Sequence, residues 1–489
     1  MSGESTGASD LEMGVSHLER IAALLANEDF YAVADALGEA ASRRCGRPRV
    51  YPHWMMLLYL CLADALDNAR AVESAFEGPA GAWLREYIGV LVKQQFPDDP
   101  GRWPPPGWPC RTAFIKWRNN VPQRYRKEFR ERFTLSGIDI ARELGLLDPE
   151  GPGSPTHPQK SRMIFHDGKV ISPLFKGKPG ERKSVAVRDA ETGTLRRVRR
   201  PVPADPDAKE HITGDKNKVL GSKFWHASVR GSERFSRVTL TVDHVPSEKD
   251  AGNSEADIAV TNLLDLLPRV PGAIGAISDT ALRGTHIDAL VRGTGRIFMV
   301  PVTAAGVDAK SGQRTEKQRY LRTVTFSDAD GTTEDVDIWI SGGRLCQQVY
   351  ADDGTPILVP LKRIANLTRP NDDGTFRTYV QYQVPCPRGG APKTITEATY
   401  QREEDGDFNR PENVRQIPPG DPDYERLKGL RSDAEAANRQ IDDHLYLRRA
   451  RSIGAERQLV DLLAHFLTEN SVARYRHRLA NGPPQARAA

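Results

Sequence analysis

The spacing of apolar residues changes three times along this chain, and each change limits what the chain can fold into. Residues 11–147 show mostly helical spacing, and residues 163–302 alternate short strands with helices. Residues 303–426 carry short alternating runs separated by DG, GG and NDDG turns, and the chain then returns to helical spacing. A Pro- and Gly-rich segment at residues 146–159, LLDPEGPGSPTHPQ, marks the first boundary. A chain of 489 residues is expected to form about two to four such units.

The order of the elements predicts the fold class of the middle part. Paired strands precede a helix, a strand, a second helix and a further strand between residues 224 and 302. That order predicts a mixed α/β core. We therefore expect a disordered tail at residues 1–10, a helical region at 11–150, a core formed by 160–302 and 425–480, and a β-rich insertion at 303–424.

Composition places the chain among soluble globular proteins. Hydrophobic residues make up 38% and charged residues 27%, with a mean hydropathy of −0.54. The most apolar run, HWMMLLYLCLADA at residues 53–65, is too short to span a bilayer, and we find no secretory signal. We therefore expect a cytoplasmic protein. The five cysteines show no CxxC or CxxxC spacing, which rules out an obvious zinc ribbon. Their odd number, without a signal peptide, argues against a disulfide framework.

A basic stretch with interleaved aromatic residues, RTAFIKWRNNVPQRYRKEFRERF, occupies residues 111–133. It holds eight basic and two acidic residues between positions 111 and 132, although the net charge of the whole chain is only +4. Such a stretch can lie along a phosphate backbone. The residues that we expect to contact DNA are Lys116, Arg118, Arg124, Arg126 and Lys127. The alternative is a solvated basic helix whose aromatic residues pack inward.

A second basic run, RRVRRPVP, occupies residues 196–203. We interpret it as a loop that is mobile without a ligand. The residues of this run that we expect to bind DNA are Arg196, Arg197, Arg199 and Arg200.

Three acidic residues lie at the ends of predicted elements. Asp167 lies in the first strand of the core (FHDGKVISPLF), Asp279 follows a short apolar strand (GAIGAISD), and Glu435 lies in the first turn of a helix (LRSDAEAANRQ). They are separated by 112 and 156 residues. Three converging carboxylates without Cys or His suit Mg²⁺ or Mn²⁺, and two such ions support phosphodiester chemistry. On this hypothesis the carboxylates lie within about 8 Å of one another.

Each acid also has a plain structural explanation. Asp167, followed by glycine, fits a type I′ hairpin turn, and Asp279, before a helical run, fits an N-cap. Ser432 and Glu435 match a capping box. Asp433 competes with Glu435 for the third position. The spacing alone leaves these alternatives open.

The sequence around these acids resembles the catalytic core of bacterial DDE transposases of the cut-and-paste insertion-sequence kind. The motif DGK at residues 167–169 matches the strand that carries the first acid of that family, and ISD at 277–279 matches the strand that ends in the second. RG at 292–293 and VP at 300–301 match the strand that follows. A β-strand insertion before the third acid resembles family four of these elements. The resemblance covers roughly residues 162–478.

Around the third acid, the family pattern is Tyr-x2-Arg-x3-Glu-x6-Lys. Arg431 and Glu435 match its Arg and Glu. Lys428 and Asp442 stand where the family has Tyr and Lys.

The resemblance implies a ribonuclease H-like α/β catalytic core. The implied activity is that of a transposase, which binds element ends, cleaves DNA strands and joins 3′-hydroxyls to a target. Asp167, Asp279 and Glu435 would be catalytic and hold two Mg²⁺ or Mn²⁺ ions, and Arg431 would contact a DNA phosphate. The implied partners are double-stranded DNA and a second copy of the chain on DNA, in the nucleoid of a bacterium.

Two alternative functions stay open from the sequence. One is a transposase-derived DNA-binding protein without nuclease activity. The other is a ribonuclease H-like nuclease that hydrolyses DNA but does not join strands. Metal-dependent nicking separates the first alternative from a transposase, and strand-transfer products separate the second.

Overall fold

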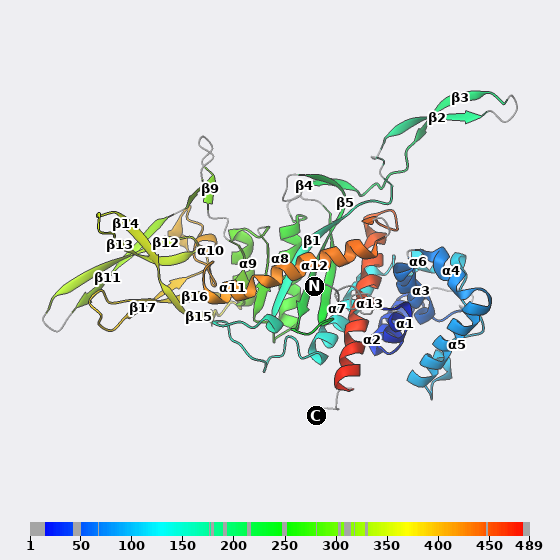
Figure 1. The fold of residues 1–489 in the computed structure, drawn as a ribbon, viewed down its shortest axis with the longest axis horizontal. Helices are drawn as coiled ribbons and strands as arrows, with labels where there is room; N and C mark the ends of the chain where they lie inside the picture. The colour runs from blue at the N-terminus through cyan, green and yellow to red at the C-terminus, as the bar shows by residue number, and fades with distance from the viewer. Residues whose placement is uncertain are drawn as a thin grey trace, which may run out of the picture.

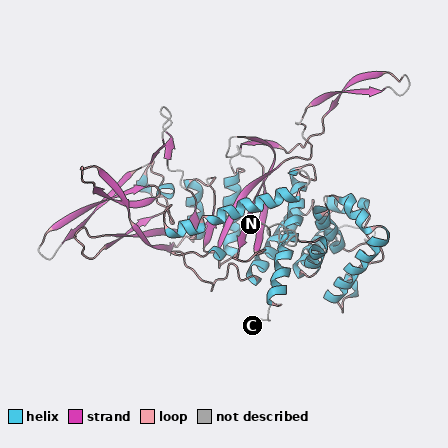
Figure 2. Cartoon of the chain, viewed as in Figure 1, coloured by secondary structure: helices cyan, strands magenta, loops and turns pink. Residues whose placement is uncertain are grey.

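The computed structural model is an elongated molecule in which three parts follow one another (Figure 1). It describes residues 15–42, 50–66, 68–175, 177, 180–188, 193–212, 217–246, 252–279, 281–301, 305–307, 314–316, 318–327, 331–445 and 448–482. The predicted tail at residues 1–10 lies outside these residues. Helices gather at one end, a mixed sheet with covering helices lies in the middle, and antiparallel strands form the other end (Figure 2).

Helices form the N-terminal part. Their bounds are α1 His17–Leu25, α2 Glu28–Ser42, α3 His53–Ala65, α4 Ala69–Phe76, α5 Gly78–Gln95, α6 Arg111–Asn120 and α7 Arg126–Glu143, with a 3-10 helix at Pro100–Arg102. Ten residues of α3 are buried, as expected for a helix that is apolar on all sides. Leu57 of α3, Phe129 of α7 and Leu463 of α13 (Ala455–Asn481) share one buried cluster. The helical part therefore packs directly onto the C-terminal helix.

A mixed sheet forms the middle of the molecule. Its strands are β1 Met163–Ile171, β4 Lys209–Ile212, β5 Lys218–Arg230, β6 Arg237–Val245, β7 Gly275–Ile277 and β8 Ile297–Met299. The main order is β6, β5, β1, β7, β8, and β4 pairs with the start of β5. β6, β5 and β1 are antiparallel neighbours, whereas β1, β7 and β8 run parallel to one another.

Helices cover both faces of this sheet. α7, α8 (Glu255–Arg269) and α9 (Gly284–Thr294) share a cluster with one face, and α12 (Gly429–His444) packs on the other. Successive side chains of a strand point to opposite faces. Accordingly, Ile164 joins the cluster with α8, whereas Met163 and Phe165 join the cluster with α12. By the same alternation, Asp167 points to the α12 face.

Antiparallel strands form the third part. Their bounds are β9 Ala305–Val307, β10 Arg314–Glu316, β11 Arg319–Ser327, β12 Thr333–Ser341, β13 Arg344–Tyr350, β14 Pro356–Pro360, β15 Lys362–Pro370, β16 Phe376–Val384 and β17 Lys393–Ala398. They form sheets in the orders β11-β12-β13-β14, β15-β16-β17 and β10-β9. Ile338, Ile340 and Tyr382 are fully buried in a separate apolar cluster. This part has a core of its own.

The chain returns from this part through short helices at Glu403–Asp405, Arg410–Asn413 (α10) and Pro422–Leu427 (α11) before α12 begins. Ile297 and Met299 of β8 lie in the same buried cluster as Leu430 and Ala434 of α12. The strand before the β-rich part and the helix after it therefore meet, as the insertion hypothesis requires.

A two-stranded ribbon lies between β1 and β5 in the sequence. β2 (Arg182–Arg188) and β3 (Leu195–Pro201) form it, and it projects from the body (Figure 1). The prediction of a basic loop at 196–203 is therefore wrong for most of the run. Val198 lies opposite Val185 in the ribbon, and such cross-strand pairs stabilise an extended backbone.

The prediction of a mixed α/β protein with a helical N-terminal region and additional antiparallel sheets is confirmed. None of the described helices is long and apolar enough to cross a membrane. Among the described residues, Cys61, Cys110, Cys346 and Cys386 form no disulfide bond.

Candidate active site

The register of two parallel strands places two of the predicted acids side by side. β1 and β7 pair with Phe165 opposite Ile277. Asp167 and Asp279 each follow this pair by two residues, so both acids lie on the α12 face just beyond the paired part of the two strands. The apolar residues Phe165 and Ile277 pack under α12, and the two acids lie next along the same face of the sheet.

The plain structural explanations for these two acids are wrong. Asp167 lies inside β1, opposite His226 of β5, and is not in a hairpin turn. α9 begins at Gly284, so Asp279 is not its N-cap. The Asp279 carboxylate instead accepts a hydrogen bond of 2.8 Å from the N–H of Ala281, which fixes the loop after β7.

Glu435 comes to the site on α12. This helix begins at Gly429, earlier than predicted, so Glu435 lies in its second turn and not in its first. Ser432 is inside the helix, and the capping-box explanation is therefore wrong. The competing Asp433 points elsewhere, because it forms an ion pair with Arg230 of β5. The Glu435 side chain is 66% exposed.

All three acids line one small cavity of about 50 Å³. Its other lining residues are Phe165, His166, Ile277, Ser278, Arg431 and Ala434. Burial, together with the negative charges of Asp279 and Glu255, raises the pKa of Asp167 to about 7. The N–H of Gly168 donates to Asp167 Oδ1 at 2.8 Å and opposes this shift. The three carboxylates thus outnumber the positive charge at the cavity, where Arg431 is the one positively charged residue among the described lining residues.

The raised pKa of Asp167 predicts how stability depends on pH. An unfolded aspartate loses its proton near pH 4, whereas folded Asp167 keeps it up to about pH 7. The free energy of unfolding therefore falls as the pH rises through this window. From about pH 5 to about pH 8 in EDTA, we expect the wild type to lose roughly 2–3 kcal/mol more than Asp167→Asn. Urea unfolding of both proteins measures this, and equal pH dependence would contradict it.

Asn438 holds Asp167 against α12. Its Nδ2 donates to Asp167 Oδ2 at 2.8 Å, and its Oδ1 lies 2.9 Å from Nε2 of His226. Burial lowers the pKa of His226 to about 4, so the imidazole is neutral at pH 7. Asn438 lies three residues after Glu435, which puts both on one side of the helix. We did not predict this residue, although its helical spacing from Glu435 was visible in the sequence.

A fourth acid lies behind Asp167. Glu255, the first residue of α8, forms a 2.5 Å ion pair with Lys223 of β5. Its carboxylate occupies the space that a Cβ on residue 168 would need, which explains the glycine after Asp167. We did not predict Glu255. The local signal was the capping box that Ser254 and Asp257 form, which begins α8 at this point.

The residues that match or depart from the family pattern also lie near the cavity. Arg431 lines it, and its Nε lies 3.9 Å from Glu435 Oε1. Asp442, which stands in place of the family's lysine, forms a 2.5 Å ion pair with Lys169 of β1. Lys169 of β1 therefore brings a lysine side chain to the part of α12 where the family has its own lysine.

Three of the five side chains that we expected to contact DNA in the first basic stretch are exposed. They are Lys116, Arg124 and Lys127. Within the described part of the chain, none of the three forms an ion pair. Trp117 and Phe129 are buried, so these aromatic residues pack inward as the alternative explanation expected.

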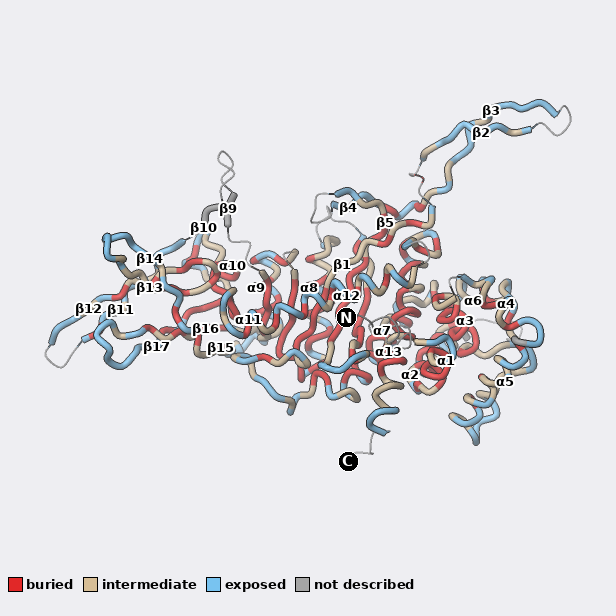
Figure 3. The backbone as a smooth tube through the Cα atoms, in the orientation of Figure 1, coloured by how far each residue is buried: buried red, intermediate tan, exposed pale blue. Residues whose placement is uncertain are grey.

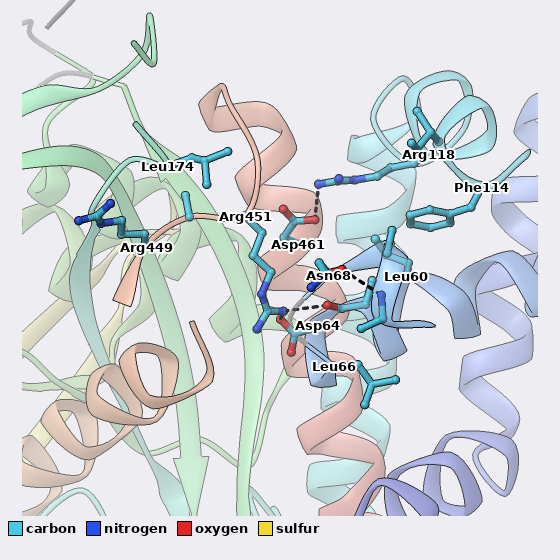
Figure 4. Close-up of a pocket in the computed structure, with 15 residues that line it drawn as sticks. Leu60, Asp64, Leu66, Asn68, Phe114, Arg118, Leu174, Arg449, Arg451 and Asp461 are labelled. Carbon is cyan, nitrogen blue, oxygen red and sulfur yellow. Dashed lines mark hydrogen bonds and ion pairs between the residues drawn. The ribbon is translucent and has the colours of Figure 1, made fainter. Parts of the chain in front are cut away.

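The other two side chains connect the N-terminal helices to α13. Arg118 forms a 2.5 Å ion pair with Asp461, and Arg126 pairs with Glu456. Figure 4 shows Arg118 reaching Asp461 at the edge of a cavity of about 690 Å³ between the helical part and the core. Their acidic partners lie far along the chain, so the local sequence gave no sign of these pairs.

A second group of ionisable residues lies near this larger cavity. Among the described residues, Asp64, His444 and His465 bring one ligand atom each within 4.8 Å of one another, and the three acids of the small cavity do not come this close. Asp64 accepts a hydrogen bond of 2.9 Å from His465 Nδ1. It accepts another from Arg451, which Figure 4 shows. Although burial opposes it, these two groups lower the pKa of Asp64 to about 2. Arg451 already supplies positive charge here, so this group acts as a link between α3 and α13.

The four residues of the second basic run lie on β3 and are exposed. Figure 1 shows their ribbon projecting on the side of the molecule where the helical part lies. Comparison of the sequence with models of protein families and with curated proteins finds no match.

Proposed function

We propose that this chain is a DNA transposase whose catalytic acids are Asp167, Asp279 and Glu435. The observation that carries the proposal is the small cavity that these three residues line, although 112 and 156 residues separate them in the sequence. Asp167 is not in a hairpin turn, Asp279 is not the N-cap of α9, and Glu435 does not take part in a capping box.

The topology supports the same proposal. Three antiparallel strands continued by two parallel ones, with the first acid on the central strand, are what a ribonuclease H-like core implies. The second acid follows the neighbouring parallel strand, and the third comes from a helix that packs on the same face. The β-rich part enters between the second and third acids, as in family four of the insertion sequences.

The donor set of the cavity fits Mg²⁺ or Mn²⁺. Carboxylate oxygens are the ligands that these ions prefer. The raised pKa of Asp167 also indicates surplus negative charge that a cation would offset. When bound, two such ions would polarise the phosphodiester and activate the attacking oxygen. Glu435 has flexible side-chain torsions and an exposed position, so it can turn toward the other two acids.

The remaining residues of the site position the acids and the DNA. Asn438 orients the Asp167 carboxylate, and the ion pair of Glu255 with Lys223 lies behind the strand. Arg431 has a half-exposed side chain at the mouth of the cavity and would contact a DNA phosphate. Lys116, Arg124 and Lys127 offer further phosphate contacts in the helical part. Joining two element ends also implies a dimer on DNA.

The test is an assay for cleavage and joining. The full chain is incubated with Mg²⁺, a linear DNA carrying the repeats that flank its own gene, and a target plasmid. We expect nicks with 3′-hydroxyl ends and covalent products that join these ends to the plasmid. Nicks without joined products would favour the hydrolytic nuclease, and binding without nicks would favour the DNA-binding protein of transposase origin.

A further inference from the structure

The projecting ribbon of β2 and β3 has almost no core of its own. The two strands pair along their whole length, and nearly all their residues are exposed (Figure 3). At the base, the N–H of Val202 donates a 2.9 Å hydrogen bond to the carbonyl of Glu181. An isolated two-stranded ribbon is at best marginally stable in water. A bound partner would therefore stabilise it.

The charge of the ribbon has a single sign. The two seven-residue strands carry seven Arg or Lys side chains and no Asp or Glu. Lys183 lies directly opposite Arg200, and like charges in such a pair destabilise a ribbon, although Lys183 also forms a 3.6 Å ion pair with Glu181 at the base. Of the acidic side chains that the structure describes, none forms an ion pair with Arg196, Arg197, Arg199 or Arg200. A polyanion would offset this repulsion.

The two faces of the ribbon differ. One face carries the small residues Ser184 and Ala186, which lie opposite Arg199 and Arg197. The other face carries the valines of both strands. Small side chains allow the backbone of the first face to approach a surface closely, while the two arginines reach forward beside it.

We propose that the ribbon enters the major groove of double-stranded DNA with its Ser184 and Ala186 face toward the base edges. The major groove of B-DNA admits a two-stranded β-ribbon, and arginine is the commonest side chain that reads guanine there. The inference rests on the proposed function, because both require DNA as the partner. It makes no use of the acid cavity, so the two can be tested separately.

The experiment measures binding of a fluorescein-labelled duplex of about 30 base pairs, by anisotropy, over a range of KCl concentrations. In one variant, an Asn-Gly turn replaces residues 182–201. Because Glu181 and Val202 are already hydrogen-bonded, this excision should leave the melting temperature unchanged. In a second variant, Arg188, Arg197 and Arg199 of the small-residue face become alanine. Its matched control removes the same charge from the valine face by changing Lys183, Arg196 and Arg200.

At about 150 mM KCl we expect the excision and the small-residue-face variant to bind about 100-fold more weakly. In the small-residue-face variant, the slope of log K against log salt should fall by up to about 2.7, because each of its three arginines that lies near a phosphate contributes about 0.9. The excision removes all seven basic side chains and should lower the slope at least as much. The affinity of the control variant should fall about tenfold, against about 100-fold for the small-residue-face variant. Wild-type affinity in the excised protein, or equal losses in the two triple variants, would overturn the proposal. An excised protein that binds DNA normally but no longer dimerises would assign the ribbon to a second copy. A wild type that does not bind DNA at all would instead reject the proposed function.

Discussion

We expect Asp167→Asn, Asp279→Asn and Glu435→Gln each to lower the rate of metal-dependent DNA cleavage by about 10³-fold or more. Each change removes one negative charge and leaves the size of the side chain the same, so a metal ion loses a ligand while the fold is kept. DNA binding in EDTA should persist, because no positive charge is lost. Denaturing gels of nicked DNA measure cleavage, and anisotropy measures binding.

Asp433→Asn is the matched control for the third acid. Asp433 lies on the same helix, two residues before Glu435, but pairs with Arg230 and does not line the cavity. We expect this variant to keep most of its cleavage. If Glu435→Gln cleaves DNA like the wild type and Asp433→Asn does not, the third acid has been misassigned.

The second large effect concerns the stability of the β-rich part. Arg410 is 2% exposed, and its Nε lies 2.9 and 2.8 Å from the two carboxylate oxygens of Asp405. Its Nη1 lies 3.3 Å from Oε2 of Glu397, which is also buried. Replacing Arg410 by methionine leaves two buried carboxylates without this partner. We expect a loss of about 3–5 kcal/mol in the free energy of unfolding, measured by urea denaturation.

Lys428→Met provides the control for this experiment. Lys428 forms an ion pair with Glu425, and both side chains are about half exposed. Exposed pairs of this kind contribute little to stability, so the midpoint of unfolding should barely move. A loss in Arg410→Met no larger than in this control would show that the buried network does not hold the β-rich part together.

The acids on β1 and β7 could be predicted from the sequence because local pattern determines their position. An apolar run ends at each acid, and parallel pairing places Phe165 opposite Ile277, so the two acids, each two residues later, become neighbours. The start of α12 was harder to predict. Leu430 is buried, and packing extends the helix by a turn before the expected first residue, which moves Glu435 to the second turn.

Long-range partners explain what the sequence could not show. Arg118 resembled a DNA contact until the fold brought Asp461 to it from 343 residues away. Asn438 and Glu255 come close to Asp167 only because β1 lies between α12 and α8. No local sequence pattern predicts this arrangement. The ribbon was mistaken for a loop because its strands bury almost nothing, so neither shows the alternation of buried and exposed residues that marks a strand.

The most direct test of the proposed site is anomalous diffraction from a crystal of the full chain soaked in Mn²⁺. We predict anomalous peaks in the cavity among Asp167, Asp279 and Glu435, and we predict that Asp167→Asn crystals lose them. Peaks confined to Asp64, His444 and His465, or no peak beside Asp167 and Asp279, would contradict the assignment of these acids as metal ligands.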